Sequence, residues 1–179
     1  MKRYIYYIEA KDLRILYRTT EQEETVFQIG ESVCYPMHGV GVVEGIEEKT
    51  VLGETARYYV LRFFTSRLTA MVPVDAAEGV GLRRVIDHAQ CESVLQYMSG
   101  EPCEESDNWN QRYRDNLAKL KGGDIYDVAD VVKCLKKRDM QKGLSAGDRK
   151  MLITARQVLV AELSAASGRD IDELRDVIG

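Results

Sequence analysis

The side chains best suited to binding chemistry surround the single tryptophan of the chain, Trp109. Its neighbours from Ser106 to Arg114 are polar, amide-rich and basic, and they include two arginines and a tyrosine. Such groups are suited to phosphates and to the edges and faces of nucleic-acid bases. The alternative is an indole that packs half-buried at a domain junction with its N–H in water, and this short window by itself slightly favours that alternative.

The charge of the chain is unevenly distributed around this tryptophan. Residues 107–162 hold 12 Lys and Arg against 8 Asp and Glu, whereas residues 1–106 hold 11 against 17 and residues 163–179 hold 2 against 4. The net charge of −4 therefore conceals one basic segment between two acidic ones. This asymmetry indicates an anionic partner for the basic segment only, although a solvated helix face has a similar composition.

The sequence does not favour an enzyme. It has no Ser/His/Asp order, P-loop, G-x-G-x-x-G motif or metal-ligand spacing. Its four cysteines are widely spaced and only two histidines accompany them, so neither a metal nor another cofactor is expected. No apolar run approaches the ~20 residues of a membrane span, and no signal-peptide pattern is found at Met1. A cytoplasmic protein without a membrane partner is expected.

The first half of the chain has the pattern of a small β domain. Short runs of β-branched and aromatic residues, separated by glycine and proline, predict five strands between Phe27 and about Val85. Five short strands within about 50 residues predict a strongly bent barrel. Pro73 lies late in the last strand. Because proline donates no ladder hydrogen bond, we expect this strand at an edge that can accept a strand from a partner.

From Ile86 onward the apolar residues recur at helical spacing. A connecting helix is predicted over 86–98, and a further helix begins near Asp107, its N-cap, and ends at about Lys121. Ser145 and Asp148 resemble a capping box, with aspartate in the glutamate position. The predicted fold is α+β with two domains: a small bent β-barrel of about five strands and a compact bundle of four to five helices. The predicted boundaries are 1–25 for an N-terminal extension, 26–85 for the β domain, 86–106 for the connecting helix and linker, and 107–179 for the helical domain.

Seven motifs follow one another in unbroken order from about Phe27 to Leu163. They are FQIGESVCYPMHGVGVVEGIE, VLGETARYYVLRF, MVPV, GVGLRRVI, NWNQRYRDNLAKLKGGD, VVKCLKKRD and KGLSAGDRKMLITARQVLVAEL. In this order they resemble the CarD/CdnL family of bacterial transcription regulators. The β part alone also resembles the RNA-polymerase-interacting domain of transcription-repair coupling factors, so the helical part with Trp109 decides for CarD/CdnL.

The resemblance implies a promoter-DNA partner for the helical domain. It implies that Trp109 wedges into the minor groove at the upstream edge of the transcription bubble and favours the open promoter complex. Basic residues on the same face would hold phosphates without reading sequence. The predicted DNA-binding residues are Trp109, Arg112, Arg114, Lys119, Lys121, Lys142, Arg149, Lys150 and Arg156.

The resemblance also implies that a Tudor-like β domain binds the RNA polymerase β subunit. The corresponding residues are Lys49, near the facing hairpin, and Met71, Val72 and Pro73 on the edge strand. Met71 could instead be a core residue of the barrel. The expected protein is a monomer that associates with the nucleoid through RNA polymerase. The alternative function is an RNA-polymerase-binding adaptor without direct DNA contact, in which Trp109 is buried.

Residues 1–25 precede the usual start of the family and are not covered by the resemblance. Their segments 5–8 and 13–17 form either an extra strand or hairpin, or a flexible extension. A further hypothesis is that translation starts at Val26 through an alternative start codon.

Overall fold

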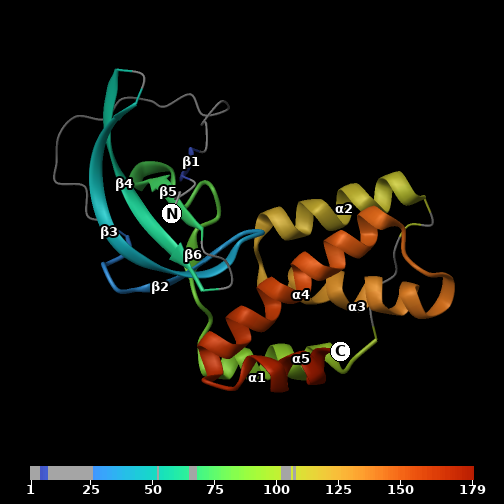
Figure 1. Cartoon of the computed structure of the whole chain (residues 1–179). Coiled ribbons are helices and arrows are strands. Elements are labelled where there is room, and N and C mark those ends of the chain that lie inside the picture. Colours follow the sequence, from blue (N-terminus) through green and yellow to red (C-terminus); the bar gives the residue numbers. More distant parts are fainter. Residues whose placement is uncertain (1–4, 8–25, 52, 65–67, 102–105, 107) are drawn as a thin grey trace.

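The computed structural model describes residues 5–7, 26–51, 53–64, 68–101, 106 and 108–179. In these ranges a curved sheet is followed by five α-helices, which confirms the predicted α+β fold in two parts (Figure 1). The strands are β1 (Ile5–Tyr7), β2 (Ser32–Tyr35), β3 (Gly39–Val51), β4 (Glu54–Phe63), β5 (Thr69–Pro73) and β6 (Arg83–Arg84), and a short 3-10 helix, η1 (Val74–Ala76), follows β5. The helices are α1 (His88–Met98), α2 (Trp109–Gly122), α3 (Ile125–Lys142), α4 (Ala146–Ser167) and α5 (Ile171–Ile178).

The sheet has the strand order β1-β5-β4-β3-β2-β6. Neighbouring strands from β5 to β6 pair antiparallel, whereas β1 pairs parallel with the outer edge of β5. A register shift between Val43 and Gly45 interrupts the β3–β4 ladder, as a β-bulge does where a strand bends. The edge strands β1 and β6 do not pair with each other, so the sheet is not closed. The predicted barrel is therefore wrong in this respect: β1 and β6 have three and two residues, and closure requires a ladder between the edge strands.

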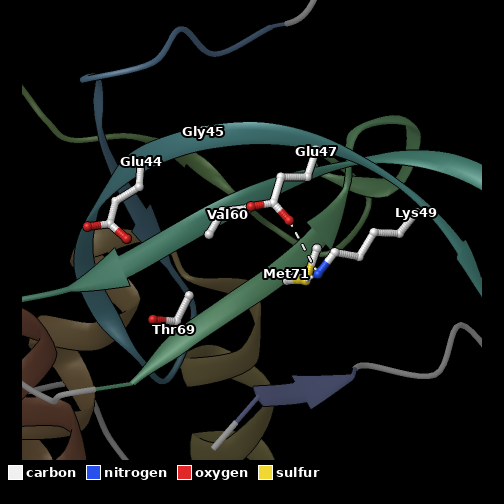
Figure 2. Close-up of a pocket in the computed structure, with 7 residues that line it drawn as sticks. All are labelled: Glu44, Gly45, Glu47, Lys49, Val60, Thr69 and Met71. Atoms are coloured by element: carbon white, nitrogen blue, oxygen red, sulfur yellow. Dashed lines mark hydrogen bonds and ion pairs between the residues drawn. The ribbon is translucent and has the colours of Figure 1, made fainter. Parts of the chain in front are cut away.

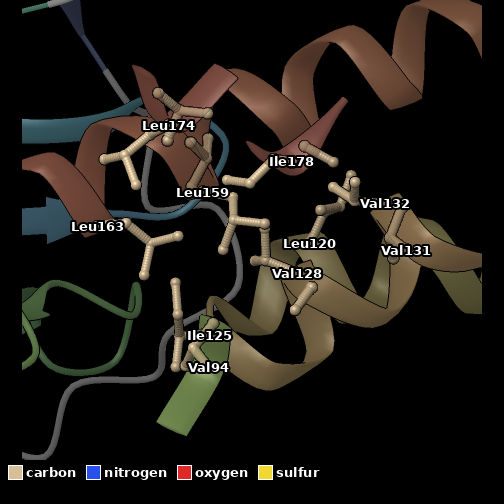
Figure 3. Packing of buried hydrophobic residues seen from close by; sticks show 14 of the residues in the cluster. Val94, Leu120, Ile125, Val128, Val131, Val132, Leu159, Leu163, Leu174 and Ile178 are labelled. Carbon is tan, nitrogen blue, oxygen red and sulfur yellow. The ribbon is translucent and has the colours of Figure 1, made fainter. Parts of the chain in front are cut away.

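Each part of the protein has its own apolar core. One face of the sheet buries Tyr59, Leu61 and Val72 together with Phe27 from the segment before β2. The helices surround a second core that includes Leu120, Val128, Leu159, Leu163 and Leu174 (Figure 3). Helix α1, predicted as a connecting element, contributes Cys91 and Val94 to this second core. It is therefore packed as part of the helical unit.

Polar side chains determine where the helices begin. The predicted helix at 86–98 begins at His88, because the Asp87 side chain accepts a hydrogen bond from the Gln90 N–H and forms a complete capping box. The N-cap of α2 is Asn108, whose Oδ1 accepts from the Gln111 N–H at 3.2 Å. The predicted cap at Asp107 is wrong for this reason, since Asn108 holds that position; Asp107 itself lies outside the described residues.

The two parts meet at an ion pair between half-buried Arg83 of β6 and Glu162 of α4. Glu162 is fully buried, and its carboxylate also accepts hydrogen bonds from the Ile86 N–H and the Cys34 thiol, each at 3.3 Å. Arg83 donates in addition to the carbonyl of Gly123, from Nη2 at 2.7 Å and from Nε at 3.0 Å. One carboxylate and one guanidinium thus connect the sheet, α4 and the turn between α2 and α3.

Close packing around Pro36 completes this junction. Gly81 and Gly123 both adopt positive φ angles, 80° and 75°. A Cβ atom built on either glycine would lie 2.8 Å from Cγ of the Pro36 ring, which is closer than real Cβ contacts come. Only glycine therefore fits at these two positions, for both backbone conformation and space.

Replacing Glu162 by glutamine should lower the free energy of unfolding by about 3 kcal/mol, because Arg83 would lose its buried counter-charge. Chemical denaturation measures the effect. The matched control is Glu44→Gln: Glu44 pairs with Arg62 on the surface, where such pairs contribute at most about 1 kcal/mol. Equal losses in the two variants would contradict a special role for the Arg83–Glu162 pair.

Candidate nucleic-acid interface and docking edge

Trp109 is the first residue of α2, and its side chain is 45% exposed. The indole stacks on Tyr113, one turn later, with ring centroids 5.4 Å apart and an interplanar angle of 29°. Its Nε1–H donates toward Ser145 Oγ at 3.3 Å and Asp148 Oδ2 at 3.2 Å, at the beginning of α4. The ring is therefore held on one side by α4 and by its own helix, while nearly half of it faces solvent.

Asp148 is the buried acceptor at this site. Its carboxylate accepts from the Trp109 indole and from the Ser145 hydroxyl, the latter at 2.9 Å. Ser145 caps α4 as predicted, since its Oγ accepts from the Asp148 N–H at 3.1 Å. The other half of the predicted capping box is not found among the hydrogen bonds of Asp148, whose carboxylate turns toward Trp109 instead. We missed this role in the sequence, although an aspartate in the place of the longer glutamate was its signal.

Arg112 was predicted to contact phosphate, but the structure places its side chain in the interior. Its side chain is only 1% exposed, and its Nη1 donates to the Ser106 carbonyl at 3.0 Å. Nη2 lies 3.9 Å from Asp148 Oδ2, so the two buried charges balance each other. The position three residues after Trp109 faces α4 and not solvent, because α2 packs there on the helical core. Arg112 supports Asp148, which in turn holds the indole.

Three predicted cations lie next to the residues that hold Trp109. Lys142 ends α3, Arg149 and Lys150 lie in the first turns of α4, and all three are exposed. We call Trp109, Lys142, Arg149 and Lys150 the Trp109 surface. The N-termini of α2 and α4 also meet here, at the end of the helical unit far from the sheet (Figure 1). Helix N-termini carry partial positive charge, so the Trp109 surface suits a polyanion.

The other predicted cations lie outside this group. Arg114 is exposed on α2, with its Nε donating to the Asn110 carbonyl at 3.2 Å, and Arg156 is half-buried further along α4. Lys119 forms an ion pair with Asp130 at 3.2 Å. Burial lowers the pKa of Lys119, but the hydrogen bond and charge of Asp130 outweigh that effect and raise it. Lys121 lies near the sheet, in a hollow that Pro36 and Gly81 also line. Lys119 and Lys121 are thus about 15 Å or more along α2 from Trp109.

The predicted polymerase contact lies along β5, at a hollow of about 220 Å³ (Figure 2). Lys49 Nζ donates to Met71 Sδ at 3.3 Å and is also 3.3 Å from Glu47 Oε2. Met71 is buried, yet it lines this hollow rather than joining the apolar core of the sheet. Val72, the next residue along the strand, points the other way and is fully packed in that core. The side chain of Val72 is therefore not available to a partner, and the residue lies opposite Tyr59 of β4. Pro73 remains half-buried at the end of the strand.

Other kinds of site are not found in the part of the chain that the structure describes. In these ranges no three His, Cys, Asp or Glu side chains come together in a way that could hold a metal ion. Of the helices described, none is long and apolar enough to cross a membrane. Cys34, Cys91 and Cys134 are buried free thiols. Burial, followed by the charge of Glu162, raises the pKa of Cys34, so its thiol stays a neutral donor.

Comparison with known proteins assigns both parts. The model of the CarD-like/TRCF RID domain matches residues 27–86, and that of the CarD C-terminal domain matches residues 93–179. A Bacillus subtilis (strain 168) protein named "Putative transcription factor YdeB" is 36% identical over 143 residues, which are 80% of this chain and 94% of that protein. The solved structure of CdnLNt from Myxococcus xanthus is 37% identical and covers 37% of this chain and 94% of its own, with a TM-score of 0.30.

A CarD-like/TRCF RID sheet joined to a CarD C-terminal helical unit defines a transcription regulator whose β part implies interaction with RNA polymerase. The chain belongs to the CarD/CdnL family of bacterial transcription regulators. The family is one of transcription factors and is not a known enzyme class. Residues 1–26 precede both matched domains.

Replacing Asp148 by alanine should release the indole and leave Arg112 as a buried charge without its acidic neighbour. We expect acrylamide to quench Trp109 fluorescence more strongly, and the free energy of unfolding to fall by about 3 kcal/mol. The single tryptophan makes the fluorescence readout specific. Asp115→Ala is the matched control, because Asp115 is exposed on the same helix and accepts from Gln111. Unchanged quenching in Asp148→Ala would contradict the positioning role.

Proposed function

We propose that this protein docks on the RNA polymerase β subunit through the outer edge of β5 and stabilises the open promoter complex with Trp109. The indole enters the minor groove at the upstream edge of the transcription bubble and occupies the gap left by an unstacked base step. Closing the bubble then has to expel the ring. The protein acts as a monomer and binds DNA without sequence preference.

The observation that carries the DNA half of this proposal is the half-exposed, fixed indole of Trp109. A ring that is already hydrogen-bonded and stacked loses little freedom when it inserts, so less of the binding energy is spent on ordering it. Exposed Lys142, Arg149 and Lys150 beside it can neutralise phosphates on either side of the step. Arg114 extends this positive region along α2, whereas buried Arg112 has a positioning role only.

The polymerase half of the proposal rests on β5. In the part of the chain that the structure describes, the outer edge of β5 is paired with the three-residue β1, and a longer strand of another protein can take that place. Met71 and Lys49, which line the hollow beside this edge, supply an apolar surface and one cation for side chains of the partner. Main-chain pairing gives affinity in such contacts, and the flanking side chains give specificity.

Trp109→Ala tests the wedge. We expect the lifetime of the open promoter complex to fall about tenfold, since one base–aromatic stacking contact contributes about 1–3 kcal/mol. Binding to RNA polymerase should not change, because the variant leaves β5 intact. Promoter-complex dissociation kinetics, with and without the protein, measure the effect.

Met140→Ala is the matched control for this experiment. Met140 is 81% exposed on α3, so the change removes an apolar side chain from the surface of the same helical unit without touching the Trp109 surface. An unchanged lifetime with Trp109→Ala would favour the alternative function, an adaptor that binds RNA polymerase without touching DNA.

Pro73→Glu tests the docking edge. Adding a carboxylate to a strand-pairing edge should weaken binding to RNA polymerase by about tenfold or more, which corresponds to roughly 1.4 kcal/mol. Ile29→Glu adds the same charge to an exposed position just before β2, on the other side of the sheet, and should leave binding unchanged. Titration with polymerase measures both affinities, and Trp109 fluorescence shows whether the helical unit stays folded. Equal affinities of the two variants would refute docking at β5.

A further inference from the structure

The outer edge of β5 is already occupied by a segment of this chain. Strand β1 pairs parallel with β5 in the register Ile5 with Thr69, Tyr6 with Ala70 and Tyr7 with Met71. These three partners make up most of β5, and they include Met71, which lines the hollow beside the strand. Strand β1 therefore lies along most of the outer edge that a partner strand would use (Figure 1).

The position of β1 in the sequence separates it from the rest of the β part. The matched RID domain begins at residue 27, whereas β1 ends at Tyr7. The other five strands of the sheet lie within that domain and pair antiparallel with one another. An unpaired edge strand is a template for pairing with other chains, and proteins often cover such an edge. Here β1 covers the edge and lies outside the matched RID domain, so β1 can be deleted without removing a strand of that domain.

We propose that β1 is an internal occupant of the polymerase-docking edge, which a strand of the RNA polymerase β subunit must displace before the protein docks. This inference rests on the proposed docking function of β5. A main-chain edge of a strand pairs with one neighbour at a time, so β1 and the polymerase strand exclude each other. Because β1 belongs to the same chain, it competes intramolecularly, and the apparent affinity falls by the fraction of molecules in which the edge is open.

The length of β1 sets the strength of this competition. Three residues make few ladder hydrogen bonds, so β1 is displaceable, whereas a longer strand from a partner gains pairing along the whole of β5. Val72 and Pro73 are not paired with β1 in the observed register. Val72 lies opposite Tyr59 of β4 and Pro73 has no N–H, so this end offers a partner strand little to pair with until β1 leaves.

The test compares three forms of the full protein in binding to RNA polymerase. They are the unaltered chain, a variant without residues 1–25, and a Tyr6→Cys, Ala70→Cys variant that can lock β1 onto β5. Paired residues of neighbouring strands lie about 5 Å apart, which a disulfide can bridge. Ala70→Cys alone, oxidised in the same way, controls for the new thiol.

We expect the variant without residues 1–25 to bind polymerase about tenfold more tightly than the unaltered chain. This is the effect of an edge that is open in about a tenth of the unaltered molecules. The oxidised double-cysteine variant should not bind, and reduction should restore binding. Equal affinities of the unaltered and shortened chains, together with full binding by the oxidised variant, would overturn the proposal.

A separate readout distinguishes failure of this inference from failure of docking itself. If no form binds polymerase, the proposed docking at β5 is refuted and the competition with it. Hydrogen exchange then tests the occupied edge independently of polymerase. Amides of β5 that face its outer edge should exchange more slowly in the unaltered chain than in the shortened one, and equal rates would show that β1 does not occupy the edge.

Discussion

The sheet and the helical unit of this protein are held together around the buried carboxylate of Glu162. A carboxylate removed from water is costly unless an opposite charge and several donors compensate it, and Glu162 receives Arg83, the Ile86 N–H and the Cys34 thiol. These groups come from the sheet and from the segment that leads out of it, while Glu162 lies in the C-terminal third of α4. If the sheet and the helical unit separated at this junction, the Glu162 carboxylate would lose the groups that compensate its burial.

At the N-terminal end of α4, a second buried carboxylate is compensated by an arginine. Asp148 and Arg112 balance each other in the interior, and Asp148 also accepts the indole N–H of Trp109. Helix α4 thus carries one buried carboxylate at the sheet and another at the Trp109 surface, about 20 Å apart along the helix axis. Helix α4 therefore links the sheet to the residues that hold the indole, and under the proposed function a protein docked through its sheet would present Trp109 in a defined direction.

The outer edge of β5 follows a different constraint. Its main-chain groups need a partner, and three residues from the start of the chain provide one in the absence of any other protein. Such a short strand protects the edge and remains replaceable. Under the proposed docking function, the same edge is protected by β1 in the free protein and is taken by a strand of RNA polymerase in the complex.

The sequence by itself determined the α+β division, the helical period after Ile86, the basic segment and the family, because these depend on local patterns and on ordered motifs. It also singled out Trp109, whose neighbours are unsuited to a core. Only the tertiary structure decided which cations near Trp109 face solvent. Arg112 and Arg149 are both arginines in basic surroundings, yet one balances Asp148 in the interior and the other is exposed. Which of the two arginines is buried depends on how the helices pack, and a short stretch of sequence holds no information on that packing. For the same reason the sheet stayed open and β1 covered β5, since closure and edge pairing depend on strand lengths and on contacts between distant segments.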